Sequence, residues 1–214
     1  MTFPPDPPNP WRIRETRVAH DSPWMRVDVH AAVDPAGADC EYGVVRFKNR
    51  AVGIVPYEVR DGVPGVWMVG QTRFALNAYS WEIPEGGVPE GEDLIVAARR
   101  ELKEETGLSA KMMTPLLQLH SSNSITDEWG QVYLATGLSM GEAAPEPSED
   151  ITVQFTPLDA LLNAIDAARI TDAMSVAALL RLERDRSSGA LSDSEFGSDS
   201  EFGSEQEAGR RPAE

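Results

Sequence analysis

The chain has 214 residues, of which 41% are hydrophobic and 25% are charged, and its formal net charge is −16. This composition is that of an ordinary globular protein, and so acidic a chain excludes a broad basic surface for nucleic acid. The single cysteine, Cys40, excludes an internal disulfide framework, and no run approaches the roughly 18 apolar residues of a membrane span, so we expect a cytoplasmic protein with no membrane partner.

The first third of the chain is dominated by patterns that are typical of β-strands. Residues 1–10 are rich in proline, and we expect a flexible N-terminus there. An N-terminal strand region at 11–48 follows. The turn sequences DPAGAD and RDGVPG separate the strand-like runs. These runs cover residues 25–33, 41–48, 51–59 and 66–74.

A helix is predicted to begin near Glu92 and to end at Gly107, because glycine suits a helix C-terminal cap. Its apolar residues recur at helical intervals and predict the face that is buried. They are Leu94, Ala97, Ala98 and Leu102.

The second half of the chain predicts further strands and two late helices. The strands are expected at 115–122, 131–138 and 151–158, and the helices at 159–168 and 173–184. Strands interleaved with one central and two late helices predict an α/β fold, with a mixed β-sheet covered by helices on both sides. We place this domain at residues 49–186.

From residue 187 the composition changes. The sequence SDSEFG occurs twice in succession, and residues 187–214 hold seven acidic and two basic residues. A segment so rich in Ser, Gly and Glu lacks the apolar residues needed to pack, so we predict a disordered acidic tail.

The predicted central helix carries three glutamates on one side, Glu101, Glu104 and Glu105. Like charges three or four residues apart destabilise a helix by about 0.2–0.5 kcal/mol, so the cluster needs either solvent or a cation beside it. Oxygen ligands in this arrangement suit Mg²⁺, with Mn²⁺ as a substitute. A solvated acidic face is the alternative, and it explains most bare E-x-x-E-E clusters.

The residues around the glutamates favour the cation. Residues 86–108 read GGVPEGEDLIVAARRELKEETGL, which resembles the Nudix box. Every fixed position of that motif is filled, namely by Gly86, Glu92, Arg100, Glu101, Leu102, Glu104, Glu105, Gly107 and Leu108. The resemblance extends over roughly residues 11–185. It implies a Nudix-type α/β/α sandwich, preceded here by the N-terminal β-rich region, and metal-dependent hydrolysis of a nucleoside diphosphate linked to another group X.

Two flanking stretches resemble the branch of ADP-ribose and nucleotide-sugar pyrophosphatases. In GQTRFALNAYSWEIPEGG (70–87), the resemblance implies that Arg73 contacts substrate phosphate or ribose and that the backbone carbonyl of Glu85 is a metal ligand. In SSNSITDEWGQVYLA (121–135), Glu128 matches a catalytic glutamate. Two departures, Asn123 in place of a proline and Thr72 in place of an aromatic residue, leave the exact substrate open.

The expected site follows from these assignments. Metal ions are held by Glu101, Glu104, Glu105 and the Glu85 carbonyl, while Arg100 and Glu92 position the ligands. The ions lower the pKa of a bound water. Glu128 orients or deprotonates this water, with Glu104 as the alternative base. Three tryptophans, Trp11, Trp24 and Trp81, are candidates for stacking on a nucleobase, although aromatic residues at such places more often pack.

Two other functions are compatible with the motif. Some Nudix-like domains sense nucleotides without cleaving them, but these usually lack box glutamates that this chain keeps. Hydrolases of damaged nucleoside triphosphates are usually shorter, whereas about 80 residues precede the box here. The expected partner is therefore a small nucleoside diphosphate derivative, cleaved to a nucleoside monophosphate and a sugar phosphate. The resemblance to the nucleotide-sugar branch also implies a homodimer, formed through the N-terminal strand region at 11–48.

Overall fold

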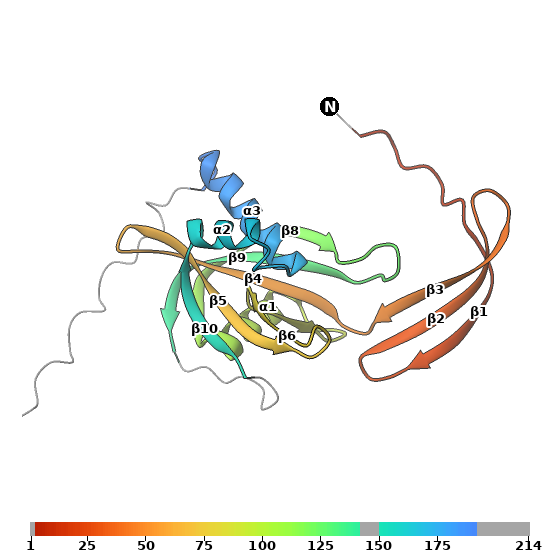
Figure 1. The fold of residues 1–214 in the computed structure, drawn as a ribbon, viewed down its shortest axis with the longest axis horizontal. Helices are drawn as coiled ribbons and strands as arrows, with labels where there is room; N and C mark the ends of the chain where they lie inside the picture. Colours follow the sequence, from red (N-terminus) through yellow and green to blue (C-terminus); the bar gives the residue numbers. More distant parts are fainter. Residues whose placement is uncertain (1–2, 142–149, 192–214) are drawn as a thin grey trace, which may run out of the picture.

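Two β-sheets organise the computed structural model, which describes residues 3–141 and 150–191. The smaller N-terminal sheet is antiparallel in the order β1-β2-β3 and projects from one end of the molecule (Figure 1). Its strands are β1 (Arg12–Asp21), β2 (Met25–Val33) and β3 (Asp39–Phe47). The expected N-terminal β-rich region is therefore present.

The larger sheet is mixed. Its strand order is β10-β5-β4-β9-β8, with β6 paired to β5 and β7 paired to β4. The pair of β4 and β9 is parallel, and the other pairs of this sheet are antiparallel. The strands are β4 (Arg50–Arg60), β5 (Val63–Arg73), β6 (Ala78–Glu82), β7 (Glu85–Val88), β8 (Leu108–His120), β9 (Trp129–Met140) and β10 (Thr152–Pro157).

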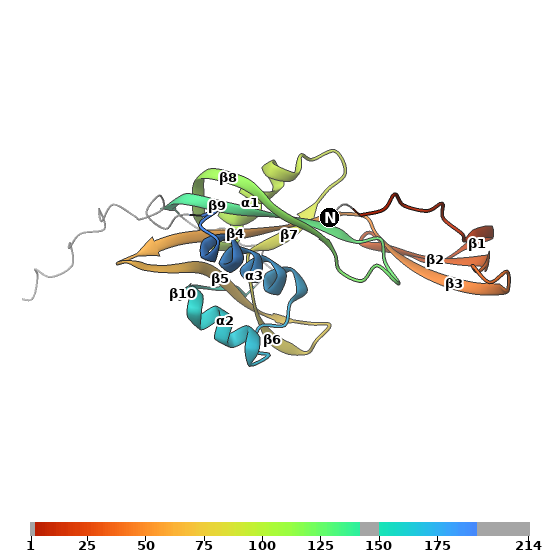
Figure 2. The same ribbon diagram turned by 90° about the horizontal axis from the view of Figure 1, so that it is seen from above.

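Helices cover both faces of the larger sheet (Figure 2). They are α1 (Leu94–Thr106), α2 (Leu158–Asp166) and α3 (Ala173–Ser187). Successive side chains of a strand point to opposite faces, and β4 shows this directly. Val52 and Ile54 pack with the buried residues of α1, whereas Val55 and Tyr57 pack with those of α2 and α3. The predicted α/β/α sandwich is confirmed.

The central helix lies close to its predicted position. Asp93 caps its N-terminus by accepting a hydrogen bond from the Ile95 N–H, and Gly107 ends it with φ 73°. This left-handed conformation suits glycine, which has no Cβ. Of the predicted apolar face, Ala97, Ala98 and Leu102 are buried and Leu94 is partly buried.

The sequence patterns missed three strands, β1, β6 and β7. All ten residues of β1 are exposed, so this strand has no alternation of buried and exposed positions to reveal it. Strand β8 also begins at Leu108 rather than at 115.

The C-terminal boundary also differs from the prediction. Helix α3 continues to Ser187, and Leu191 packs against the buried cluster that α2 and α3 form with the larger sheet. The predicted tail from 187 therefore overlaps residues that pack, while its part from 192 to 214 lies outside the described residues. In the part of the chain that the structure describes, no helix is both long and apolar enough to cross a membrane.

Candidate active site

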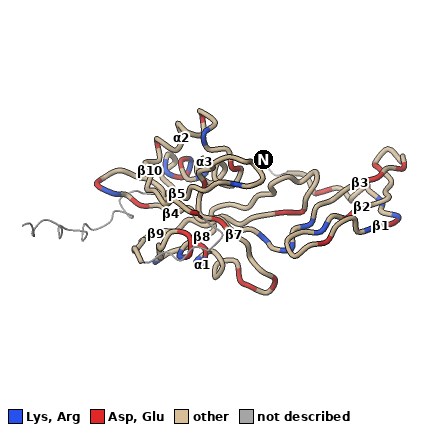
Figure 3. Tube along the Cα trace, turned by 60° about the horizontal axis from the view of Figure 1, so that its bottom comes forward, with Lys and Arg blue, Asp and Glu red and all other residues tan. Residues whose placement is uncertain are grey.

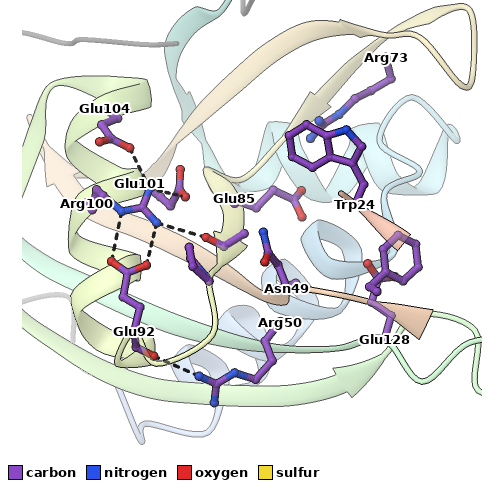
Figure 4. A pocket seen from close by; sticks show the side chains of 15 residues that line it. Trp24, Asn49, Arg50, Arg73, Glu85, Glu92, Arg100, Glu101, Glu104 and Glu128 are labelled. Carbon is purple, nitrogen blue, oxygen red and sulfur yellow. Dashed lines mark hydrogen bonds and ion pairs between the residues drawn. The ribbon is translucent and has the colours of Figure 1, made fainter. Parts of the chain in front are cut away.

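A cleft with a volume of about 890 Å³ lies where the N-terminal sheet meets the larger sheet. Its walls come from the β1–β2 and β3–β4 turns, the end of β5, strand β7, helix α1 and the loop between β8 and β9 (Figure 4). Acidic and basic residues lie side by side along α1 (Figure 3). The lining residues are Trp24, Phe47, Asn49, Arg50, Ala51, Arg73, Glu85, Gly86, Gly87, Pro89, Glu92, Arg100, Glu101, Glu104 and Glu128.

Arg100 forms hydrogen bonds to three glutamates on one wall of the cleft. Its Nη1 donates to Glu101 Oε1 at 2.7 Å and to Glu104 Oε2 at 3.0 Å, and its Nη2 donates to Glu92 Oε2 at 3.1 Å. It also donates to the carbonyl of Gly87 at 3.2 Å. The hydrogen bond to Glu92, followed by those to the other two carboxylates, raises the pKa of Arg100. The expected pairing of Arg100 with box glutamates is thus present in the cleft.

Gly86 makes room for the Glu101 carboxylate. A Cβ atom at position 86 would lie 2.1 Å from Glu101 Cδ and 2.3 Å from its Oε1. These separations are far below van der Waals contact, so a larger residue would displace this carboxylate. The glycine that opens the motif is required by the close approach of a glutamate of the same motif.

Glu85 lines the cleft, whereas Glu105 does not, and the two residues are in contact. Glu105 is 3% exposed, and its Oε2 accepts a hydrogen bond from the Glu85 N–H at 3.1 Å. The Oε1 of Glu85 is buried and has no hydrogen-bond partner among the described residues. Burial, reinforced by the nearby carboxylates of Asp172 and Glu82, raises the pKa of Glu85 well above its usual value. Sequence reasoning singled out the carbonyl of Glu85 and gave no sign of this buried carboxyl group.

The donor set fits a divalent cation. Among the described residues, no three His, Cys, Asp or Glu side chains are already spaced to hold a metal ion. Glu101 and Glu104 instead share Arg100. The available donors are nevertheless carboxylate and carbonyl oxygens, which Mg²⁺ prefers, and the unpartnered Glu85 oxygen shows that the polar groups here are not all satisfied by protein.

Arg73 and Glu128 complete the cleft on its far side (Figure 4). Arg73 is fixed by Glu82, which is 3% exposed, through hydrogen bonds from Nε at 2.9 and 3.1 Å and a further one from Nη2. This pairing raises the pKa of Arg73. Glu128 stands just before β9, and its N–H donates to Thr126 Oγ1 at 3.0 Å. The structure thus brings both residues into one cavity with Glu92, Glu101 and Glu104 of the box.

Two of the predicted site residues, Glu105 and Trp11, are not among the residues that line the cleft. The ring of Trp11 packs edge-on against Tyr42, with centroids 5.3 Å apart. Trp24, 76% exposed, lies at the cleft instead. Asn49 and Arg50 also line it, although no sequence motif pointed to them; Arg50 donates to the Glu92 carbonyl at 3.0 Å.

Comparison of the sequence with known proteins adds three findings. A family model described as NUDIX domain matches residues 47–177. A CMP-5'-(N-acetyl-N-hydroxy-3-aminopropyl)phosphonate hydrolase of Streptomyces rubellomurinus is 29% identical over 170 residues, covering 79% of this chain and 81% of the relative. An ADP-ribose pyrophosphatase of Bacillus subtilis is 35% identical over 118 residues, covering 54% of this chain and 64% of the relative.

A solved structure has the same fold. The crystal structure of an ADP compounds hydrolase superposes with a TM-score of 0.75 at 21% sequence identity, covering 87% of this chain and 100% of the other.

Proposed function

Because this chain belongs to the Nudix hydrolase family, we propose that it hydrolyses the diphosphate bond of a nucleoside diphosphate linked to a second group, such as ADP-ribose or another nucleotide sugar. Water adds to one phosphorus atom, and the bond from that phosphorus to the bridging oxygen breaks. The products are a nucleoside monophosphate and a sugar phosphate.

One observation carries this proposal. The cleft is lined by three glutamates of the box, by three arginines that can meet phosphate and, on the opposite wall, by the loop residue Glu128. Phosphoryl transfer requires mainly positioning and charge stabilisation from a protein, and these residue types supply both. The similarity to an ADP-ribose pyrophosphatase and to a hydrolase of a CMP-linked phosphonate supports a nucleotide joined to a second group.

The same cleft supports dependence on a divalent metal, with Mg²⁺ expected and Mn²⁺ as a substitute. The groups that would hold it are the carboxylates of Glu101, Glu104 and Glu105 and the carbonyl of Glu85. When bound, such an ion neutralises phosphate charge and lowers the pKa of a coordinated water. Arg100 holds two of these carboxylates, and with Glu92 it keeps that wall in position before substrate arrives.

The remaining side chains have separate tasks. Arg73, held by Glu82, presents its guanidinium to phosphate or ribose oxygens. Glu128 orients the attacking water or accepts its proton. Its carboxylate has no protein partner among the described residues, whereas the carboxylate of Glu104, the alternative base, is bound to Arg100. This difference favours Glu128.

A panel of substrates tests the reaction and the base together. Wild type and Glu128→Gln are incubated with Mg²⁺ and ADP-ribose, other nucleotide sugars, a CMP-linked alkylphosphonate, dinucleotides and nucleoside triphosphates, and the released monophosphate is quantified. We expect the highest kcat/KM on a nucleotide joined to a sugar or phosphonate. In Glu128→Gln, kcat should fall about 10²- to 10⁴-fold, because the amide cannot accept the proton, with little change in KM.

Two results would contradict the proposal. Hydrolysis of triphosphates alone would replace the substrate class. Wild-type turnover in Glu128→Gln, alongside an inactive Glu104→Gln, would move the base into the box while leaving the substrate class intact.

A further inference from the structure

The loop that carries Glu128 is bound to the N-terminal sheet. The Val45 N–H of β3 donates to the Ile125 carbonyl at 2.8 Å, and Val45 pairs with Thr126 as a parallel β-bridge. The Tyr42 hydroxyl, also on β3, donates to the carbonyl of Ser124. Since β2 occupies one edge of β3, the loop lies along the other edge and extends the sheet.

A chain of ion pairs reinforces this attachment. Arg46 Nη1 donates to Asp127 Oδ2 at 2.7 Å, and Arg46 Nε donates to Asp28 Oδ2 at 2.8 Å. Asp28 is 2% exposed and also accepts from Arg26 Nε at 2.6 Å. The hydrogen bond from Arg26 has the larger effect, and together with the hydrogen bond from Arg46 it lowers the pKa of Asp28. A buried carboxylate thus fixes one edge of the Arg46 guanidinium while the other edge holds the loop.

The geometry needs an arginine at this position. Its planar guanidinium presents separate N–H groups in a fixed fork, so it can bind two carboxylates at once in a set orientation. A buried ion pair is weak evidence for stability, but it can specify one arrangement over others. Here the arrangement that it specifies is the path of residues 124–127 along β3.

Glu128 directly follows this attached segment. Its own N–H is held by Thr126 Oγ1, and two residues later Gly130 pairs with Ala51 of β4. The backbone of Glu128 is therefore fixed on one side by the N-terminal sheet and on the other by the larger sheet, while its side chain faces the cleft (Figure 4).

We propose that Arg46, anchored on the buried Asp28, is a positioning residue for the reaction and acts through Asp127 to hold the Glu128 carboxylate in place. This inference rests on the proposed role of Glu128. It gives the N-terminal sheet a catalytic task within its own chain. A displacement of about 1 Å in a catalytic group can cost up to about 10²-fold in rate, so fixing a loop of this kind affects turnover.

Four variants of the full chain test the proposal: Asp127→Ala, Glu128→Gln, the double variant, and Asp21→Ala as control. Asp127 is about half exposed, so its loss should leave the fold intact. Asp21 is a matched control because it pairs with Lys48 at 2.6 Å in the same sheet with similar exposure, without touching the loop. We expect Asp127→Ala to lower kcat about 10- to 100-fold with KM nearly unchanged, and Asp21→Ala to resemble wild type.

The double variant separates positioning from a structural role. If Asp127 acts through Glu128, its removal should not lower kcat further in the Glu128→Gln background. An equal further loss there, or wild-type kcat in Asp127→Ala, would overturn the inference while leaving the proposed reaction in place. Wild-type kcat in Glu128→Gln would remove the proposed base, and with it the task assigned to Arg46.

Arg46→Lys gives an independent readout. The ammonium keeps the charge but lacks the fork, so we expect a loss of kcat similar to that of Asp127→Ala and a melting temperature close to that of wild type. Full activity in folded Arg46→Lys would show that the fork is not needed and would count against the proposal.

Discussion

At the scale of single residues, the candidate site depends on close contacts between residues of the motif, which the motif itself does not show. Gly86 has no positive φ, so its importance comes from the space that it leaves for Glu101. An added methyl group would push this carboxylate away without straining the backbone, because a glutamate side chain can turn aside.

We therefore predict that Gly86→Ala folds normally but binds metal poorly. Turnover at fixed Mg²⁺ should fall by up to about 10²-fold, as expected for a displaced group in an active site, and more Mg²⁺ should be needed for half-maximal activity. Turnover against Mg²⁺ concentration, with Mn²⁺ binding by calorimetry, measures this. Gly43→Ala is the control, since its added methyl group would meet no atom within 4 Å. Unchanged Mg²⁺ dependence in Gly86→Ala would refute the role assigned to Glu101.

At the scale of elements, the sequence predicted those strands and helices that have a local pattern of apolar residues or caps. Alternating or continuous apolar runs located β2, β4, β5 and β9 to within a few residues, and Gly107 marked the end of α1. Strand β1 was not predicted because all its residues are exposed, so only its pairing with β2 defines it.

The residues of the candidate site also fall into two groups, those that the sequence could place and those that only the fold brings together. The glutamates of α1 are fixed by helical spacing and could be placed from the sequence alone. The contact of Arg46 with Asp127 spans 81 residues, and the raised pKa of Glu85 comes from burial first and then from the carboxylates of Asp172 and Glu82. No local pattern encodes such contacts, because the fold brings these residues together.

The end of α1 allows a prediction about stability. Gly107 adopts φ 73°, and its N–H donates to the Lys103 carbonyl. Gly107→Ala would place a Cβ in the left-handed region, which costs roughly 1–2 kcal/mol for an L-residue. Urea denaturation should show a lower free energy of unfolding of about this size. Gly37 is also at positive φ but lies in an exposed turn. The loss of stability in Gly37→Ala therefore shows what the same substitution costs outside a helix cap. No loss of stability in Gly107→Ala would contradict the capping role.

At the scale of the whole molecule, the two edges of the N-terminal sheet differ in what lies beside them. One edge, β3, holds the loop of its own chain that carries Glu128. The other edge, β1, is exposed at all ten positions, and it displays Ile13 and Val18 at 61% and 52% exposure. A long edge strand with exposed apolar residues is open to pairing with another chain. We propose that a second copy of this chain pairs there.

Replacing these apolar residues should separate the copies. We predict that wild type is a dimer by light scattering coupled to size-exclusion chromatography, and that Ile13→Lys/Val18→Lys is a monomer, because charge on both surfaces disfavours pairing of the strands. Leu180→Lys on α3 is the control, since Leu180 is 50% exposed but lies on a different element, and it should stay dimeric. Since each chain holds its own Glu128 loop through β3, the folded monomer should keep the Mg²⁺ dependence of the wild type. A monomeric wild type, or a dimer that survives both lysines, would rule out β1 as the interface.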